Sequence, residues 1–225
     1  MNKNGSQITY FSLSTKLVEQ AAEHVLNLLS DNLPPEFIFH NQRYTVQTVH
    51  AVTQISEAEE MHLHDRFILQ IAAWFHHTGF INTNTHHRSE SVRLMQEFMQ
   101  RHEVDEDAIN LVSQTIMHSA SAWDATTSYD MILYDADWYF LSASNFKEML
   151  ERKKEEMVLL HGKLSPLEWS DFIDECFVKH KYLTNYGQEF LNNRRRINYF
   201  NYKKMPESEW SFDREQRSIS RSFLS

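Results

Sequence analysis

The sequence predicts an all-α domain, and three observations support this prediction. Glycine and proline are scarce, with four of each in 225 residues, whereas sandwiches, barrels and doubly wound sheets need both residues for their turns. Apolar residues recur at helical spacing along most of the chain. Apolar residues make up 41% of the chain and charged residues 24%, which is typical of a globular protein and not of a disordered or fibrous one.

The apolar spacing predicts nine helices. The first follows a serine cap, Ser12 or Ser14, and ends before Pro34 and Pro35. The third ends before Gly79, because glycine is favoured just after a helix. The expected helices cover residues 13–29, 40–58, 64–77, 88–101, 105–118, 130–142, 145–161, 166–182 and 186–203.

The segments between the predicted helices are expected to be loops, and one of them contains a clear signal for the start of a helix. The segment SPLE at 165–168 combines a serine cap, a proline in the first turn and a glutamate at the capping-box position. Polar and small residues at 82–86 and 119–128 predict loops. No repeat or low-complexity linker divides the chain, so we expect one helical domain, residues 1–204, followed by a C-terminal tail, residues 205–225.

Charge and cysteine content restrict the expected partners and compartment. The net charge of -9 disfavours nucleic acid and anionic membranes as partners, and the basic, aromatic run at 194–204 is interpreted as the solvated end of the last helix. No secretion signal and no apolar run of about 18 residues is found. Cys176 has no partner for an intrachain disulfide, which fits a reducing compartment. We therefore expect a cytoplasmic protein, and a homo-oligomer is compatible with the sequence.

Histidines and aspartates at helix ends form a candidate metal site. The chain has 13 histidines, and histidine is the commonest metal ligand. His76 lies one helical turn beyond Ala72, so it extends the buried face of the third helix, and His77 points about 100° around the axis. Adjacent side chains at a helix end can thus reach one site from two directions. Further candidate ligands are His87, His118, and either Asp135 or Asp137.

Each of these residues also has an ordinary structural explanation. A lone histidine such as His76 on an apolar helix face is more often a hydrogen-bonded core residue than a ligand. His87 could be a solvated loop residue, Asp135 an exposed helix acid and Tyr44 a core tyrosine. The metal-site hypothesis therefore rests on the whole set of residues, in their order along the chain and with their neighbours, and not on any one of them.

Five sequence segments, four of which contain candidate site residues, follow one another along the chain. They are FHNQRYTVQTV (39–49), AAWFHHTGF (72–80), THHRSESV (85–92), ILYDADWYFL (132–141) and HKYLTNYG (180–187). In this order and spacing, over roughly residues 13–203, the chain resembles the HD superfamily of metal-dependent phosphohydrolases. The resemblance implies a single-domain, phosphodiesterase-like HD helical bundle.

The resemblance also implies roles for individual residues. His76 matches the metal-binding histidine of the signature, and Asp137 matches its closing carboxylate ligand. His40 matches the histidine that acts as general acid to the leaving group in the phosphodiesterases. His87 and His118 fall where members with two metals place additional histidines.

Three positions depart from the family pattern. Tyr44 replaces the first metal-binding histidine, and a phenol with an ordinary pKa of about 10 is a poor ligand at neutral pH. His77 replaces the signature aspartate, and a neutral imidazole cannot bridge two cations as a carboxylate can. Arg88 stands where the pattern has glutamate. These changes disfavour a bridged two-metal site and leave a single cation as the simpler arrangement.

The remaining candidate ligands indicate which cation the site would hold. This set is rich in nitrogen, so it suits zinc, iron or nickel better than magnesium, which prefers oxygen. The residues concerned are His76, His77, His87, His118 and Asp137.

Two functional hypotheses follow. In the first, the protein is a phosphohydrolase that uses a metal-activated water on a nucleotide or another small phosphorylated substrate, through an altered, mononuclear site. In the second, the substitutions at Tyr44 and His77 leave a catalytically inactive HD-fold module without metal, which binds a nucleotide or a protein. An iron-dependent oxygenase is a third idea, and the loss of the bridging aspartate argues against it.

Overall fold

The computed structural model describes residues 14–204, and within them it contains nine α-helices and no β-strand. The all-α prediction is confirmed for this part of the chain. The tail predicted at 205–225 lies outside the described residues. The helices are α1 (Thr15–Asn32), α2 (Gln42–Ala58), α3 (Leu63–Phe75), α4 (His87–Arg101), α5 (Glu106–His118), α6 (Ser128–Asp137), α7 (Phe146–His161), α8 (Pro166–Asp174) and α9 (Asn192–Lys204).

Short turns of other helix types connect several of these elements. Two are 3₁₀ turns, η1 (Thr78–Ile81) and η2 (Tyr139–Ser142), which follow α3 and α6. Two are π-helical turns, η3 (Glu175–Lys179) and η4 (Gly187–Leu191), which lie on either side of an extended segment before α9. Among the described helices, none combines the length and the apolarity needed to cross a membrane.

Side-chain caps explain where several helices begin. Ser14 caps α1, since its hydroxyl accepts a hydrogen bond from the backbone of Leu17 at 3.3 Å. Ser165 and Glu168 form the reciprocal bonds of a capping box at the start of α8, as the sequence predicted. A serine cap therefore begins both helices at the positions that local side-chain chemistry favours.

Three helices end earlier than the apolar spacing predicted. The expected helices 64–77, 130–142 and 166–182 end at Phe75, Asp137 and Asp174. In the first two cases a 3₁₀ turn continues the chain, and its spacing of three residues preserves the apolar pattern, so the pattern does not reveal the change. The third ends in a π-helical turn in which the His180 backbone donates to Glu175 at 2.8 Å.

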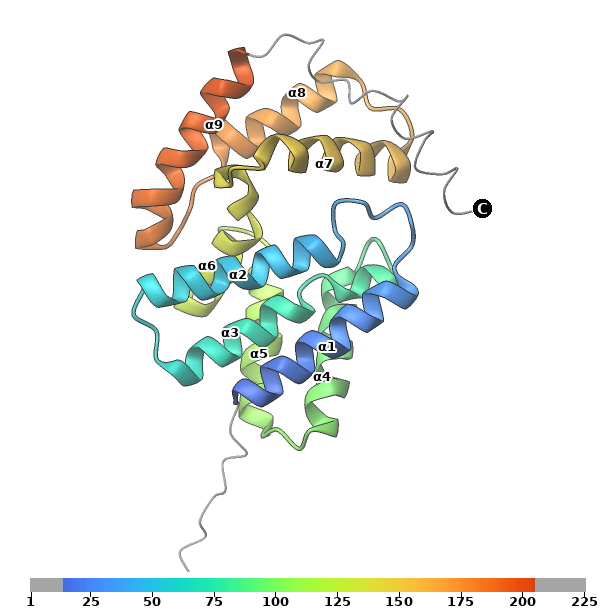
Figure 1. Ribbon diagram of the computed structural model, residues 1–225, viewed down its shortest axis with the longest axis vertical. Helices are drawn as coiled ribbons and strands as arrows, with labels where there is room; N and C mark the ends of the chain where they lie inside the picture. Colours follow the sequence, from blue (N-terminus) through green and yellow to red (C-terminus); the bar gives the residue numbers. More distant parts are fainter. Residues whose placement is uncertain (1–13, 205–225) are drawn as a thin grey trace, which may run out of the picture.

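The helices pack around two apolar cores. The larger core is built mainly from α1 to α6, and the smaller one lies between α7, α8, η3 and the segment before α2. In Figure 1, α7, α8 and α9 gather on one side of the molecule and α1, α3, α4 and α5 on the other, with α2 between them. Tyr44 belongs to the smaller core, while Ala72 and Ala136 belong to the larger one. The candidate site residues therefore lie where the two cores meet.

Candidate metal site and adjoining cavity

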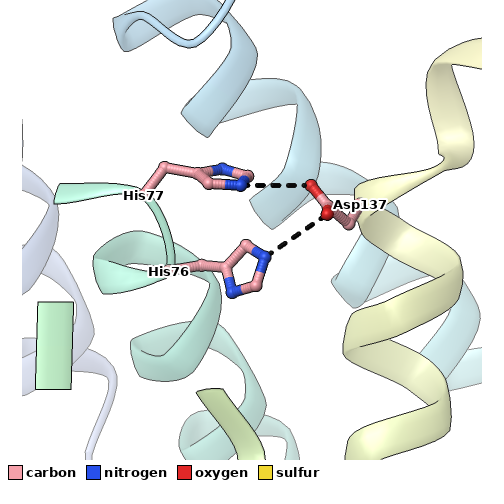
Figure 2. A group of neighbouring side chains, drawn as sticks. All are labelled: His76, His77 and Asp137. Carbon is pink, nitrogen blue, oxygen red and sulfur yellow. Dashed lines mark ion pairs between the residues drawn. The ribbon is translucent and has the colours of Figure 1, made fainter. Parts of the chain in front are cut away.

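Three side chains from two helix ends converge on one point. His76 and His77 follow the last residue of α3, and Asp137 is the last residue of α6. His76 Nε2 lies 3.4 Å from Asp137 Oδ2, and His77 Nε2 lies 3.5 Å from Asp137 Oδ1. Figure 2 shows both imidazoles pointing toward the carboxylate. One ligand atom from each residue can be chosen so that all lie within 4.8 Å of one another, which is close enough to share an ion.

The hydrogen bonding of His76 fits a metal ion at this point. The side chain is fully buried, and among the described residues its Nδ1 has no hydrogen-bond partner, while the only polar contact of Nε2 is the 3.4 Å approach to Asp137. Buried polar groups are normally paired, so such a histidine needs an explanation. Two imidazoles and a carboxylate are also a common ligand set for zinc and other transition metals. The residues present therefore fit one divalent cation, for which His76 would supply a nitrogen whose only polar neighbour is the candidate ligand Asp137.

Burial and mutual repulsion favour the metal-binding forms of these groups. Burial and the adjacent His76 hold the pKa of His77 well below its usual value, so the imidazole is neutral at neutral pH. Burial raises the pKa of Asp137, but the neighbouring His77 and His76 outweigh this effect, and the pKa lies well below its usual value. Neutral imidazole and ionised carboxylate are the forms that bind a metal.

A serine and a glycine hold the turn that carries the two histidines. Ser91 in α4 donates to the His76 carbonyl at 3.1 Å and accepts from the Gly79 backbone at 2.9 Å. A Cβ on Gly79 would lie 1.9 Å from the His87 carbonyl oxygen, so only glycine permits this approach of η1 to α4. Ser91 and Gly79 thus fix the turn, and the structure explains why both sequence segments contain them.

Tyr44, at the altered ligand position, contacts the carboxylate of the trio. Its hydroxyl donates to Asp137 Oδ1 at 2.9 Å and also to the Asp137 carbonyl. Burial, together with the Asp137 charge, raises the pKa of Tyr44 well above its usual value. The phenol therefore stays protonated and acts as a hydrogen-bond donor to the candidate ligand.

His40 lies nearby and is held by a glutamate that the sequence did not single out. His40 Nδ1 lies 2.5 Å from Glu156 Oε1, and the backbone groups of Phe39 and His40 each donate to Glu156 Oε2 at 2.9 Å. Glu156 in α7 is 1% exposed. Burial and the Lys153 ammonium lower the pKa of His40 more than Glu156 raises it. A neutral His40 thus donates its Nδ1 proton to the ionised Glu156.

A cavity of about 280 Å³ adjoins this group. Besides His40, His77 and Asp137, it exposes two cationic side chains, Arg88 and Lys153. The remaining wall is made by Phe37, Phe80, Asn84, His87, Glu156, Met157, Leu160 and His161. The cavity therefore places two of the candidate ligands, His40 and two cationic side chains around one small volume.

Two of the predicted metal ligands lie outside the trio. His87 lines the cavity, where its ring stacks on Phe80 with centroids 4.0 Å apart and lies 5.9 Å from the His77 ring. His118 is 48% exposed, and its Nδ1 lies 3.7 Å from Asp130 Oδ2. Asp130 precedes Asp137 by about two turns of α6, or roughly 10 Å. The structure therefore brings His76, His77 and Asp137 together and places His118 elsewhere.

The first aspartate of the Asp-Ala-Asp run at 135–137 has a structural role. Asp135 is fully buried and accepts hydrogen bonds from the backbones of Leu183 and Thr184 at 2.8 and 2.9 Å. Burial raises its pKa to about 6. A Cβ on Gly187 would lie 2.4 Å from its carboxylate. These contacts explain the HKYLTNYG segment, which folds over Asp135 instead of contributing a ligand.

No family model, curated protein or solved structure was found to match this chain. Membership of the HD superfamily therefore stays a prediction from the sequence motifs, and the function must be argued from the site.

Proposed function

We propose that the protein is a metal-dependent phosphohydrolase of the HD type, which acts on a nucleotide or another small phosphoester. One cation, with zinc, iron or nickel favoured over magnesium, would be held by His76, His77 and Asp137. The observation that carries the proposal is the buried trio, in which His76 has no hydrogen-bond partner outside the trio among the described residues, beside a cavity lined by two cationic side chains.

The cation, when bound, would act as a Lewis acid that polarises a phosphoryl oxygen and makes a water more acidic. Hydrolysis needs only water as a second reactant: its oxygen bonds to phosphorus, the ester P–O bond breaks, and a proton passes to the leaving oxygen. Because Nδ1 of His40 is engaged by Glu156, Nε2 is the atom that remains for this transfer. A phosphate in the cavity would raise the pKa of His40, since negative charge favours the imidazolium.

The proposal is tested by measuring turnover of a panel of phosphoesters by protein purified without chelator and loaded with zinc, iron or nickel. We expect hydrolysis of at least one phosphoester, and a kcat at least about 100-fold lower in His40→Asn, the scale of general acid–base catalysis. Glu156→Gln should lower kcat in the same direction, because it removes the group that orients His40. His50→Asn, an exposed change on α2, is the matched control and should retain wild-type turnover.

One observation favours the alternative, a catalytically inactive HD-fold module that binds a nucleotide or a protein. Tyr44 donates to Asp137 Oδ1 at 2.9 Å, and this bond stabilises the carboxylate in the absence of a metal. Tyr44 also takes the place of a fourth protein ligand, so any cation would have fewer donors from the chain.

A double substitution, Tyr44→His with His77→Asp, separates the two candidates. If the unchanged protein turns over no phosphoester but the double variant does, the fold is competent and the natural site is inactive, as the module requires. If the unchanged protein turns over a phosphoester and the double variant does not exceed it, the altered site is the working one.

A further inference from the structure

Two cations of the cavity come from different helices. Arg88 lies in the first turn of α4, and Lys153 lies in the middle of α7. Lys153 is anchored against the wall, because its Nζ lies 3.7 Å from Glu156 Oε1 and 5.0 Å from the centre of the Phe39 ring. It is 21% exposed at the side chain, so the cation is partly withdrawn from water but still faces the cavity.

Arg88 has no comparable anchor. Its Nε is buried and has no hydrogen-bond partner among the described residues. Leaving a buried donor of a charged group unpaired costs more free energy than leaving a neutral donor unpaired. A buried guanidinium N–H without a partner, on a side chain that lines a cavity, is therefore evidence for a ligand that accepts hydrogen bonds there.

The carboxylates of the cavity are already engaged by other groups. Glu156 accepts from two backbone N–H groups and from His40. Asp137 accepts from Tyr44 and faces the two histidines of the trio. Within the described residues Arg88 thus forms no ion pair with a carboxylate and acts on Asp137 only through space, and a cation bound at the trio would make the cavity more positive still.

From this arrangement we infer that the cavity selects a phosphomonoester dianion over a phosphodiester, with Arg88 and Lys153 holding its terminal phosphate oxygens. This inference rests on the proposed function, because it names the substrate class of the same site. Arginine binds phosphate oxygens through a planar fork of N–H groups, and lysine adds a compact charge. A monoester offers three unsubstituted oxygens and two negative charges, whereas a diester offers two oxygens and one charge.

The size of the cavity leads to the same ligand class. Pockets for drug-sized ligands span roughly 300 to 1,000 Å³, and this cavity of about 280 Å³ lies just below that range. A diester must place a substituent on both sides of its phosphorus, whereas a monoester has only one. A small monoester, or the terminal phosphate of a larger one whose other end lies outside, fits the available space better.

The inference is tested by calorimetric titration with two matched probes that contain no ester bond, so that the protein cannot hydrolyse them. Methylphosphonate is mostly a dianion with three unsubstituted oxygens at mildly alkaline pH, and dimethylphosphinate is a monoanion of similar size with two. We expect full-length protein, both metal-free and zinc-loaded, to bind the dianion at least about tenfold more tightly than the monoanion. Arg88→Met and Lys153→Met should each remove most of this preference, and Arg88→Lys should retain part of it.

The controls are cations on the same two helices that do not line the cavity. Arg93→Met removes an exposed arginine of α4, and Lys154→Met removes the neighbour of Lys153 that lies over the Trp169 ring. Both should keep the wild-type preference. Equal binding of the two probes by the wild type, or an unchanged preference in Arg88→Met and Lys153→Met variants that melt like the wild type, would overturn the inference.

The same samples separate this inference from the proposed function. Selective binding of the dianion through Arg88 by a protein that hydrolyses no phosphoester would support the inference while the phosphohydrolase proposal fails. If the protein turns over phosphoesters but its anion binding is unchanged in Arg88→Met and Lys153→Met, the inference is overturned and the phosphohydrolase proposal still stands.

Discussion

His76 and His180 are both buried but differ in their polar contacts, as expected for a candidate ligand and a structural side chain. The His180 ring packs against Tyr134 and Trp138, and its Nδ1 is 3.1 Å from the Tyr134 hydroxyl, while its Nε2 has no partner among the described residues. The only polar contact of His76 in this part of the chain is the 3.4 Å approach of its Nε2 to Asp137. The sequence does not separate the two cases, because each histidine adjoins apolar residues and the partners lie far along the chain.

The surroundings of His180 predict a pH dependence of stability. Burial and the Arg195 guanidinium lower the pKa of His180 to about 3, whereas an unfolded histidine has a pKa of about 6.5. Between these values the unfolded chain binds the additional proton, so the free energy of unfolding falls as pH falls from about 6.5 toward 3. The contribution of this one residue between pH 7 and pH 5 is about 2 kcal/mol.

His180→Gln removes this contribution and should therefore lose less stability than the wild type between pH 7 and pH 5. Urea unfolding at the two pH values measures the difference. The exposed His50→Gln is the control and should follow the wild type. If His180→Gln loses as much stability over this interval as the wild type, the lowered pKa is wrong.

At the scale of elements, the site is built from helix ends and not from helix faces. His76 and His77 lie just after α3, and Asp137 closes α6. The sequence predicted both helices but extended each past its end, because a 3₁₀ turn keeps the apolar spacing of the helix before it. The structure shows why α3 ends where it does. Ser91 bonds to the backbone of His76 and Gly79, and these bonds stabilise the turn in place of a further turn of α-helix.

Ser91→Ala should weaken the turn that presents His76 and His77. The change leaves the His76 carbonyl and the Gly79 N–H without a partner in a buried setting, which costs roughly 1–3 kcal/mol for such groups. We expect the free energy of unfolding to fall by about this amount and the affinity for zinc to fall with it. Ser89→Ala, an exposed change in the same helix turn, should alter neither quantity. Ser91→Ala with wild-type stability and zinc affinity would show that the turn does not depend on this serine.

At the scale of the whole molecule, the sequence predicted the order of the helices and the meeting of His76 with Asp137. It did not predict Glu156 or Lys153, which lie on α7 more than 110 residues after His40. Which face of α7 approaches the segment before α2 depends on how the smaller core packs, and spacing within α7 alone does not reveal this. The burial of an acid such as Glu156 can be recognised only after the helices have been packed together, because acids are usually exposed.

The same assembly explains why His118 does not join the predicted ligands. It ends α5 beside the first turn of α6, whereas Asp137 ends that helix. Two histidines and one aspartate are thus what the described fold brings together, and a metal at this point would tie the two apolar cores to each other.

The number of metal atoms per chain tests this account most directly. Elemental analysis of protein purified without chelator after growth with added zinc, iron and nickel should find about one transition-metal atom per chain in the wild type. His76→Ala and Asp137→Asn should lose it, while His118→Ala should retain it. A wild type that carries no more metal than His76→Ala, with a melting temperature unchanged by any of these cations, would contradict the central claim.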